Sequence, residues 1–560
     1  MRRFLSALAY SVPLALSQTA SAQQTYTDSI IHYEPITGFF PAFGARLALG
    51  EANGDGVLDL FIADQGGPKK ALILLGPSFT QRVDIAVPPF DGPWGIVGFD
   101  IGDVNGDLVD DAFIGPAGAT VNGAQLAGRA FVVLGPAYQQ SVELMRTATE
   151  SYYENFGNDF AMADVDHDGT LDLLVGAPRA LVNHVTGGRI DIYRGSTSFT
   201  GQPFSAIPAL VPMGQSAWGR SIVIADVDHD GLDDLVTNSM KSATEVGYRV
   251  LWNLDPASSL QMAIPSSQAT SGWGYRVKIA DIDGDGDEDV VSTDPSFGGG
   301  RTHVFRGPAF GPPQNLTVSG QSSNAYTGRA LDVGDVNRDG YGDVVVGGPT
   351  DDIGPNQAVP DAGRLTIFFG PTFATTQSFW GQYTNTHFGE GVLLHDFDDD
   401  GFPELLVGAG GEWGGGTIHL MKHEPLAIDG PSTVSLSAGG SIQFRLQRGA
   451  LSANAPYLML VSASGSAPGL NIPFADGFVH LPLNFDAATQ FGIQFASSPV
   501  FANFQGTLDA AGSANPKLVV PAGSNDPALI GLTLTFAAVL GESGPYVDRA
   551  TNAVTVVLGS

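Results

Sequence analysis

One acidic pattern recurs seven times along the chain and limits what it can fold into. If the first acidic residue of each copy is position 1, oxygen-bearing side chains stand at positions 1, 3, 5 and 9, close to an apolar run. The copies follow one another roughly every 50 to 60 residues, a period that indicates a repeat architecture. The seven sets are Glu51, Asn53, Asp55 and Asp59; Asp103, Asn105, Asp107 and Asp111; Asp164, Asp166, Asp168 and Asp172; Asp226, Asp228, Asp230 and Asp234; Asp281, Asp283, Asp285 and Asp289; Asp335, Asn337, Asp339 and Asp343; and Asp396, Asp398, Asp400 and Glu404.

Two further features repeat in the same register. An apolar run such as "DLLVGAP" follows each acidic stretch, and in most copies a second apolar run then ends in a turn. No sustained helical period interrupts these runs. An aromatic residue stands next to a glycine shortly before each acidic stretch, with one extra residue between them in the sixth copy: Phe43-Gly44, Trp94-Gly95, Phe156-Gly157, Trp218-Gly219, Trp273-Gly274, Tyr326-Thr327-Gly328 and Phe388-Gly389.

Each repeat therefore supplies four strands, and seven such units predict an all-β, seven-bladed β-propeller over residues 23–424. The apolar runs are continuous, as expected where neighbouring blades cover both faces of each sheet. The seventh copy lacks an outer strand, so we expect the N-terminal segment 27–35 to complete that blade and close the ring. From residue 425 the acidic pattern stops, and short alternating runs between Gly, Pro and Ser turns predict a small β-sandwich over residues 425–560.

The N-terminus predicts export. Arg2 and Arg3 precede a short apolar stretch and a small-residue cleavage motif ending at Ala22, so residues 1–22 have the composition of a signal peptide. The remaining chain contains no apolar run long enough to span a bilayer. Cysteine is absent, so rigidity cannot come from disulfide bonds. We therefore expect a secreted or cell-surface protein.

The net charge of −32 argues against two classes of binding partner. Such a chain repels the phosphates of nucleic acids and the anionic surface of membranes. No nucleophile elbow, P-loop or metalloprotease motif occurs. We therefore assign no catalytic residues and expect a protein that is not an enzyme.

The acidic loops are suited to calcium, which takes six to eight oxygen ligands. Side chains at positions 1, 3 and 5 can converge on one point, with a carbonyl at position 7 and a carboxylate at position 9. Magnesium fits less well because it keeps its waters, and an EF-hand would need a glutamate at position 12. Up to seven Ca²⁺ ions, one per blade, are expected. The third to fifth loops, with four Asp each, are the strongest candidates. Leu108 replaces the usual glycine at position 6 of the second loop, so the sequence does not decide whether that loop binds an ion.

The alternative for a single loop is a simple Asp-Gly turn without metal, but seven copies in register favour cation binding. Without metal, the crowded carboxylates would repel one another or raise one another's pKa. Calcium is therefore expected to act as part of the fold.

The aromatic–glycine pairs followed by "GDVNRDGYGDVVVGGP" and "ADVDHDGTLDLLVGAP" resemble the FG-GAP repeat of the integrin α-subunit N-terminal propeller and its bacterial relatives. The resemblance covers roughly residues 27–424. It implies a seven-bladed ring with a calcium-binding loop in a hairpin of the blade, and partner binding on the face opposite those loops. It favours a non-enzymatic binding or adhesion module for an extracellular protein or glycan. The alternatives are a carbohydrate-binding or polysaccharide-cleaving propeller, and a passive structural surface component.

Overall fold

The computed structural model describes most of the chain from Tyr26 onward. The described residues are 26–34, 42–65, 69–147, 152–209, 217–242, 245–265, 273–352, 359–397, 402–412, 416–423, 426–448, 452–466, 470–474, 477–481, 483–496, 498–510, 512–524, 526–541 and 549–560. The predicted signal peptide, residues 1–22, lies outside these ranges, as do the predicted ligands Asp398 and Asp400.

The described residues up to 423 contain seven four-stranded antiparallel sheets. The first three sheets are β2 (Arg46–Gly50), β3 (Asp59–Ala63), β4 (Ala71–Leu75) and β5 (Gln81–Ile85); β6 (Gly98–Gly102), β7 (Asp111–Gly115), β8 (Phe131–Leu134) and β9 (Gln140–Glu143); and β10 (Phe160–Ala163), β11 (Asp172–Ala177), β14 (Arg189–Tyr193) and β15 (Pro203–Pro208). The next three are β16 (Ile222–Ala225), β17 (Asp234–Ser242), β18 (Glu245–Leu251) and β19 (Ser259–Pro265); β20 (Val277–Ala280), β21 (Asp289–Asp294), β22 (Arg301–Phe305) and β23 (Gln314–Leu316); and β24 (Ala330–Gly334), β25 (Asp343–Gly348), β26 (Arg364–Phe369) and β27 (Thr375–Trp380). The seventh is β28 (Phe388–His395), β29 (Glu404–Ala409), β30 (Gly416–His423) and β1 (Tyr26–Glu34).

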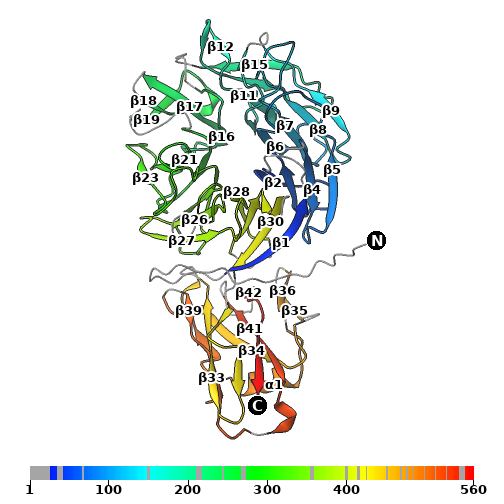
Figure 1. Cartoon of the computed structure of the whole chain (residues 1–560), viewed down its shortest axis with the longest axis vertical. Coiled ribbons are helices and arrows are strands. Elements are labelled where there is room, and N and C mark those ends of the chain that lie inside the picture. The colour runs from blue at the N-terminus through cyan, green and yellow to red at the C-terminus, as the bar shows by residue number, and fades with distance from the viewer. Residues whose placement is uncertain are drawn as a thin grey trace.

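The sheets form a closed ring around a central axis (Figure 1). The first strand of each sheet contacts the first strand of the next, and β28 of the last sheet returns to contact β2 of the first. Apolar clusters between successive sheets form the core, and β3, β7 and β11 are buried along their whole length. The predicted all-β propeller fold is confirmed.

The last sheet contains both ends of the propeller sequence. β1 pairs antiparallel with β30, with Tyr26 opposite His423 and Glu34 opposite Gly416. β1 is the outer strand of this sheet, and it comes from the N-terminal end of the propeller sequence. β1 therefore joins the start of the repeat array to its end through backbone hydrogen bonds.

Glycines allow neighbouring sheets to approach closely. A Cβ atom on Gly176 in β11 would lie 1.9 Å from the carbonyl oxygen of Gly219, which belongs to the next sheet. A Cβ atom on Gly408 in the last sheet would likewise lie 2.3 Å from the carbonyl oxygen of Gly44, next to the first sheet. No side chain fits at either distance, so the glycine of the apolar run and the glycine beside the aromatic residue meet between blades.

The C-terminal part contains two sheets that share one apolar core, and this agrees with the predicted sandwich. One sheet has the order β31 (Leu426–Asp429), β33 (Gly440–Gln447), β40 (Lys517–Val520) and β37 (Phe501–Ala502), with β39 (Ser513–Ala514) beside β33. The other has the order β32 (Thr433–Ser435), β43 (Val554–Gly559), β41 (Thr533–Leu540), β34 (Pro456–Ser462) and β38 (Gln505–Thr507), with β42 (Arg549–Ala550) beside β41. Phe444 of the first sheet and Phe536 of the second pack at 4.9 Å between ring centroids.

Smaller elements complete the described structure. They are the hairpins of β12 (Leu181–Val182) with β13 (Val185–Thr186) and of β35 (Leu470–Phe474) with β36 (Gly477–Leu481), the 3-10 helices Trp252–Leu254 and Pro527–Leu529, and the single described α-helix, α1 (Ala487–Gln494). Within the described part of the chain, no helix has the length and apolar character needed to cross a membrane.

Candidate metal sites

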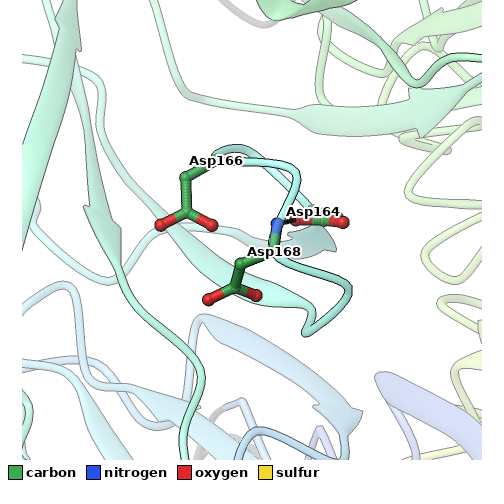
Figure 2. A group of neighbouring side chains, drawn as sticks. All are labelled: Asp164, Asp166 and Asp168. Atoms are coloured by element: carbon green, nitrogen blue, oxygen red, sulfur yellow. Dashed lines mark hydrogen bonds between the residues drawn. The ribbon is translucent and has the colours of Figure 1, made fainter.

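Each acidic loop connects the first strand of its sheet to the second. In the third sheet, β10 ends at Ala163 and β11 begins at Asp172, so positions 1 to 8 form the connection and position 9 begins the second strand. Figure 2 shows Asp164, Asp166 and Asp168 projecting from this one loop. The same arrangement recurs in all seven sheets, which places the described loops at one end of the strands.

Within the described residues, three loops gather carboxylates closely enough to share one cation. In each, the side chains at positions 1, 3 and 5 offer ligand oxygens that all lie within 4.8 Å of one another. These are the third, fourth and fifth loops, the strongest candidates from the sequence. The three groups are Asp164, Asp166 and Asp168; Asp226, Asp228 and Asp230; and Asp281, Asp283 and Asp285.

The carboxylates at positions 1 and 5 also fold the loop. The Asp164 carboxylate accepts hydrogen bonds from the backbone N–H groups of Asp168 at 3.0 Å and Gly169 at 2.9 Å. Asp168 in turn accepts one from the N–H of Thr170 at 2.9 Å. These bonds close a tight turn around the acidic residues, as Asp side chains commonly do. The turn accounts for positions 1 and 5, but not for position 3.

The aspartate at position 3 has an oxygen without a donor. Oδ2 of Asp166 forms an ion pair with Arg194, whereas its Oδ1 is shielded from solvent and accepts no hydrogen bond. Asp283 repeats the arrangement: Oδ2 lies 3.5 Å from the Arg306 guanidinium and Oδ1 is shielded and unpartnered. A buried carboxylate oxygen without a donor is costly. A cation at the centre of the cluster would satisfy it.

Position 9 has a structural role that the sequence did not reveal. The Asp172 carboxylate is fully buried and accepts hydrogen bonds from the N–H of Val165 at 3.2 Å and the N–H of Gly195 at 3.0 Å. The bond to the N–H of position 2 recurs in all seven loops, and in six of them the carboxylate also accepts from the turn after the third strand. Position 9 therefore ties the acidic loop to the body of its blade.

Burial opposes the charge on this residue. It raises the pKa of Asp111 to about 7 and that of Asp343 to about 8, although backbone N–H donors act in the opposite direction. The same burial raises the pKa of Asp59, Asp172, Asp234 and Asp289. A divalent cation close by would favour the ionised form.

The second loop keeps the common geometry despite its leucine. Leu108 has a φ of 67°, the left-handed conformation that the glycine adopts at this position elsewhere, and its side chain is 82% exposed. Its N–H donates to the Asp103 carboxylate at 2.7 Å, as the N–H of Gly169 does to Asp164. The leucine therefore strains the backbone but does not change the turn.

Three of the four remaining loops have fewer carboxylates at positions 1, 3 and 5. The first, second and sixth loops have asparagine at position 3: Asn53, Asn105 and Asn337. In the sixth loop Asp335 accepts from the N–H of Asp339 and of Gly340, so the turn is the same. In the seventh loop, Asp396 and Glu404 are described, and Glu404 accepts from the N–H of Phe397 at 2.7 Å.

Sequence reasoning did not single out a group of arginines at the other end of the strands. Arg46, Arg220 and Arg329 each stand one or two residues after the glycine of an aromatic–glycine pair. They meet at a cavity over the axis of the ring. Their shared register was a signal in the sequence, but only the ring closure shows that they converge.

Comparison with known families supports the repeat assignment. A family model described as FG-GAP-like repeat matches residues 164–237 and 281–346, and a second, described as FG-GAP repeat, matches residues 327–368. The chain therefore contains FG-GAP repeats over these residues.

Its propeller resembles that of integrin α subunits. Integrin alpha-IIb of Homo sapiens is 26% identical over 231 residues, which cover 37% of this chain and 21% of that protein. Integrin alpha-5 of Xenopus laevis is 25% identical over 243 residues, covering 40% and 22%. Integrin alpha-PS2 of Drosophila melanogaster is 29% identical over 257 residues, covering 40% and 17%. The matched region thus spans about a fifth of the length of these relatives.

Among solved structures, Drosophila Semaphorin 2a aligns over 99% of this chain and 97% of its own. Its TM-score of 0.29 and sequence identity of 7% are too low to support an argument about this protein.

Proposed function

We propose that this chain is an exported, calcium-stabilised β-propeller that acts as a non-enzymatic binding or adhesion module outside the cell. The observation that carries the calcium part is the convergence of three carboxylates within 4.8 Å in each of three loops. The shielded, unpartnered oxygens of Asp166 and Asp283 point to the same conclusion.

Calcium is the cation that these donors fit best. The ligands are carboxylate oxygens on a flexible loop, and carbonyls and waters can complete the six to eight contacts that Ca²⁺ takes. Magnesium demands a stricter octahedral shell and gives up its waters reluctantly. Position 9 would serve as a further ligand through lone pairs not used by the backbone N–H groups. The number of ions would reach seven if the asparagine-containing loops and the seventh loop also bind.

The role of the ions is structural in this proposal. Each loop joins the first two strands of a blade, so a bound cation would hold the inner hairpin closed. The chain has no cysteine, and cation binding replaces disulfides as the cross-link that favours the folded state.

A binding role follows from the resemblance to integrin α subunits together with the N-terminal segment that predicts export. Propellers present loops on a rigid ring, and loops on rigid scaffolds commonly carry binding function. The ligand would be an extracellular protein or glycan.

Calcium stoichiometry tests the proposal. The full-length mature chain, dialysed against EDTA and then titrated with Ca²⁺ in a calorimeter, should take up at least three ions. The triple variant Asp166→Asn, Asp228→Asn, Asp283→Asn removes one carboxylate from each cluster and should lose most of the heat of binding. An Asp84→Asn variant, on the outer strand β5, should titrate like the parent chain. Uptake of no calcium by the parent chain, or equal uptake by the triple variant, would overturn the assignment.

A further inference from the structure

A cavity of about 900 Å³ lies over the axis of the ring, at the strand ends away from the acidic loops. Arg46 begins β2, whereas the acidic loop follows the other end of that strand, so the cavity and the metal sites are on opposite faces. A volume of this size is typical of pockets for small ligands.

The charge of the cavity is opposite to that of the chain. Four arginines line it, and none of its described lining residues is Asp or Glu. The chain as a whole has 58 acidic and 26 basic residues, so composition alone would place acidic residues here. The lining arginines come from the strands or connecting loops of four different sheets: Arg46, Arg179, Arg220 and Arg329.

Two of these arginines form no ion pair with a described residue. The Nε of Arg46 is shielded from solvent and has no acceptor in the described structure. Arg179, on the loop after β11, is exposed and forms no ion pair with a described residue. Arg329 is different, because Glu390 holds its Nε at 3.1 Å and Gln65 accepts from its Nη2 at 3.3 Å. Within the described residues, the cavity therefore combines one arginine fixed by an ion pair with two that form none, although Asp159 and Asp100 act on the Arg46 charge from a greater distance.

The lowered pKa of the Tyr275 phenol indicates a positive electrostatic potential in the cavity. Burial opposes its ionisation, but the neighbouring Arg329 and Arg46 guanidiniums outweigh that effect and lower its pKa. A positive potential in a partly buried site attracts anions more strongly than the same charges do in bulk water.

Exposed aromatic side chains surround the arginines. Trp94 is 43% exposed, Tyr152 is 65% exposed and Tyr153 is 46% exposed, and all three line the cavity. Trp94 lies against the backbone of Gly118, where a Cβ would be 2.8 Å from its ring. Aromatic faces supply rigid contact area for the apolar faces of a ligand, while polar groups fix its orientation. A small inorganic anion would leave these faces unused.

We propose that this cavity binds a saccharide that bears a carboxylate, with the carboxylate held by Arg46 and Arg179 and a sugar ring packed on the exposed aromatic side chains. Arginine suits this role because its planar guanidinium can bind both carboxylate oxygens at once. The inference rests on the proposed binding function, but its residues are distinct from those of the cation sites. A concave cavity favours a small ligand over a protein partner, which needs a broad surface of about 800 Å² per side.

Calorimetry with the full-length mature chain, in 150 mM NaCl and 1 mM CaCl₂, tests the proposal. The probes are a hyaluronan hexasaccharide, sialyllactose, the carboxyl methyl ester of each, and a hexaglutamate peptide. At least one acidic saccharide should bind at least tenfold more tightly than its own ester. Arg179→Gln and Arg46→Gln should each weaken that binding about tenfold or more, because each removes a charge-assisted hydrogen bond. The matched control is Arg82→Gln on β5, which should bind like the parent chain.

Equal affinity for acid and ester, absence of binding by both acidic saccharides, or an unchanged affinity in Arg179→Gln would each overturn the proposal. Tighter binding of hexaglutamate than of either saccharide would overturn it in favour of an acidic protein partner. Calcium uptake, measured on the same preparation, separates the two proposals. Uptake without saccharide binding rejects only the pocket, and saccharide binding without uptake rejects only the cation sites.

Discussion

Arg338 in the sixth acidic loop reaches Ser452 in the C-terminal sandwich, with Nη1 of Arg338 donating to Oγ of Ser452 at 3.3 Å. Phe402, at position 7 of the seventh acidic loop, stacks on His423 with 4.0 Å between ring centroids. The guanidiniums of Arg338 and of the sandwich residue Arg448 lie over the same phenylalanine ring, at 5.4 and 4.9 Å. The sandwich therefore contacts the propeller beside its last two acidic loops.

Removal of the phenylalanine at this contact should destabilise the protein. Phe402 is fully buried, so Phe402→Ala is expected to cost about 3–5 kcal/mol. Arg338→Ala removes one cation–π contact and should cost only about 1 kcal/mol. Urea denaturation measures both. Phe485→Ala, at a side chain that is 54% exposed, is the control and should change little; an equal loss at Phe402 and Phe485 would contradict the contact.

Variants at positions 3 and 9 of the third loop should behave differently. Asp172→Ala leaves the buried N–H groups of Val165 and Gly195 without an acceptor and should cost about 2–6 kcal/mol, with or without calcium. Asp166→Ala should lower the melting temperature in calcium but not in EDTA. Thermal denaturation in both buffers measures the difference. If Asp172→Ala were neutral in EDTA, position 9 would have no structural role.

Relief of backbone strain in the second loop should stabilise the protein. Leu108 is exposed and has a φ of 67°, so Leu108→Gly is expected to raise the free energy of unfolding by about 0.5–1 kcal/mol. Leu58→Gly, at an exposed leucine of the first loop without positive φ, should instead lower it because glycine gains more freedom in the unfolded chain. Chemical denaturation measures the free energy of unfolding of both variants. If Leu58→Gly also stabilised the protein, the gain in Leu108→Gly could not be attributed to relief of backbone strain at Leu108.

A buried histidine should make stability fall in acid. Burial lowers the pKa of His303 from 6.5 to about 4, and its Nδ1 lies 2.6 Å from Oδ1 of Asn315. Between these values the unfolded chain binds a proton that the folded chain excludes. Above pH 6.5 the imidazole of His303 is neutral in both states and does not reduce the free energy of unfolding. As the pH falls from 6.5 to 4, that free energy decreases by on the order of 3 kcal/mol.

The His303→Gln variant isolates this effect. Its free energy of unfolding should fall less steeply than that of the parent chain between pH 6.5 and 4, although the variant is less stable at pH 8. Urea titrations at fixed pH give both slopes. Parallel slopes for the two proteins would show that His303 does not titrate as expected.

The repeat pattern was enough to predict the propeller, because register repeated seven times fixes both the strands and the loops between them. The carboxylate clusters at Asp164, Asp226 and Asp281 were also predictable, since positions 1, 3 and 5 of a tight turn lie together whatever the rest of the fold does. The pairing of residues 26–34 with β30 followed from an outer strand missing in the seventh copy.

Contacts between distant segments were not predictable from spacing. Position 9 looked like a fourth ligand, but its partner Gly195 lies 23 residues further on and only the sheet brings it back. The arginines of the cavity come from separate blades, so their convergence depends on ring closure. The short helix α1 and the parallel pairing of β32 with β43 left no clear periodicity.

The melting temperature of the full-length mature chain in 1 mM CaCl₂ and in EDTA tests the cation-bound propeller most directly. Three sites filled at a hundredfold excess over their Kd stabilise a domain of this size by roughly 10 °C. We expect a rise of that order in calcium and no comparable rise in the Asp166→Asn, Asp228→Asn, Asp283→Asn variant. Equal melting temperatures of the parent chain in the two buffers would contradict the account.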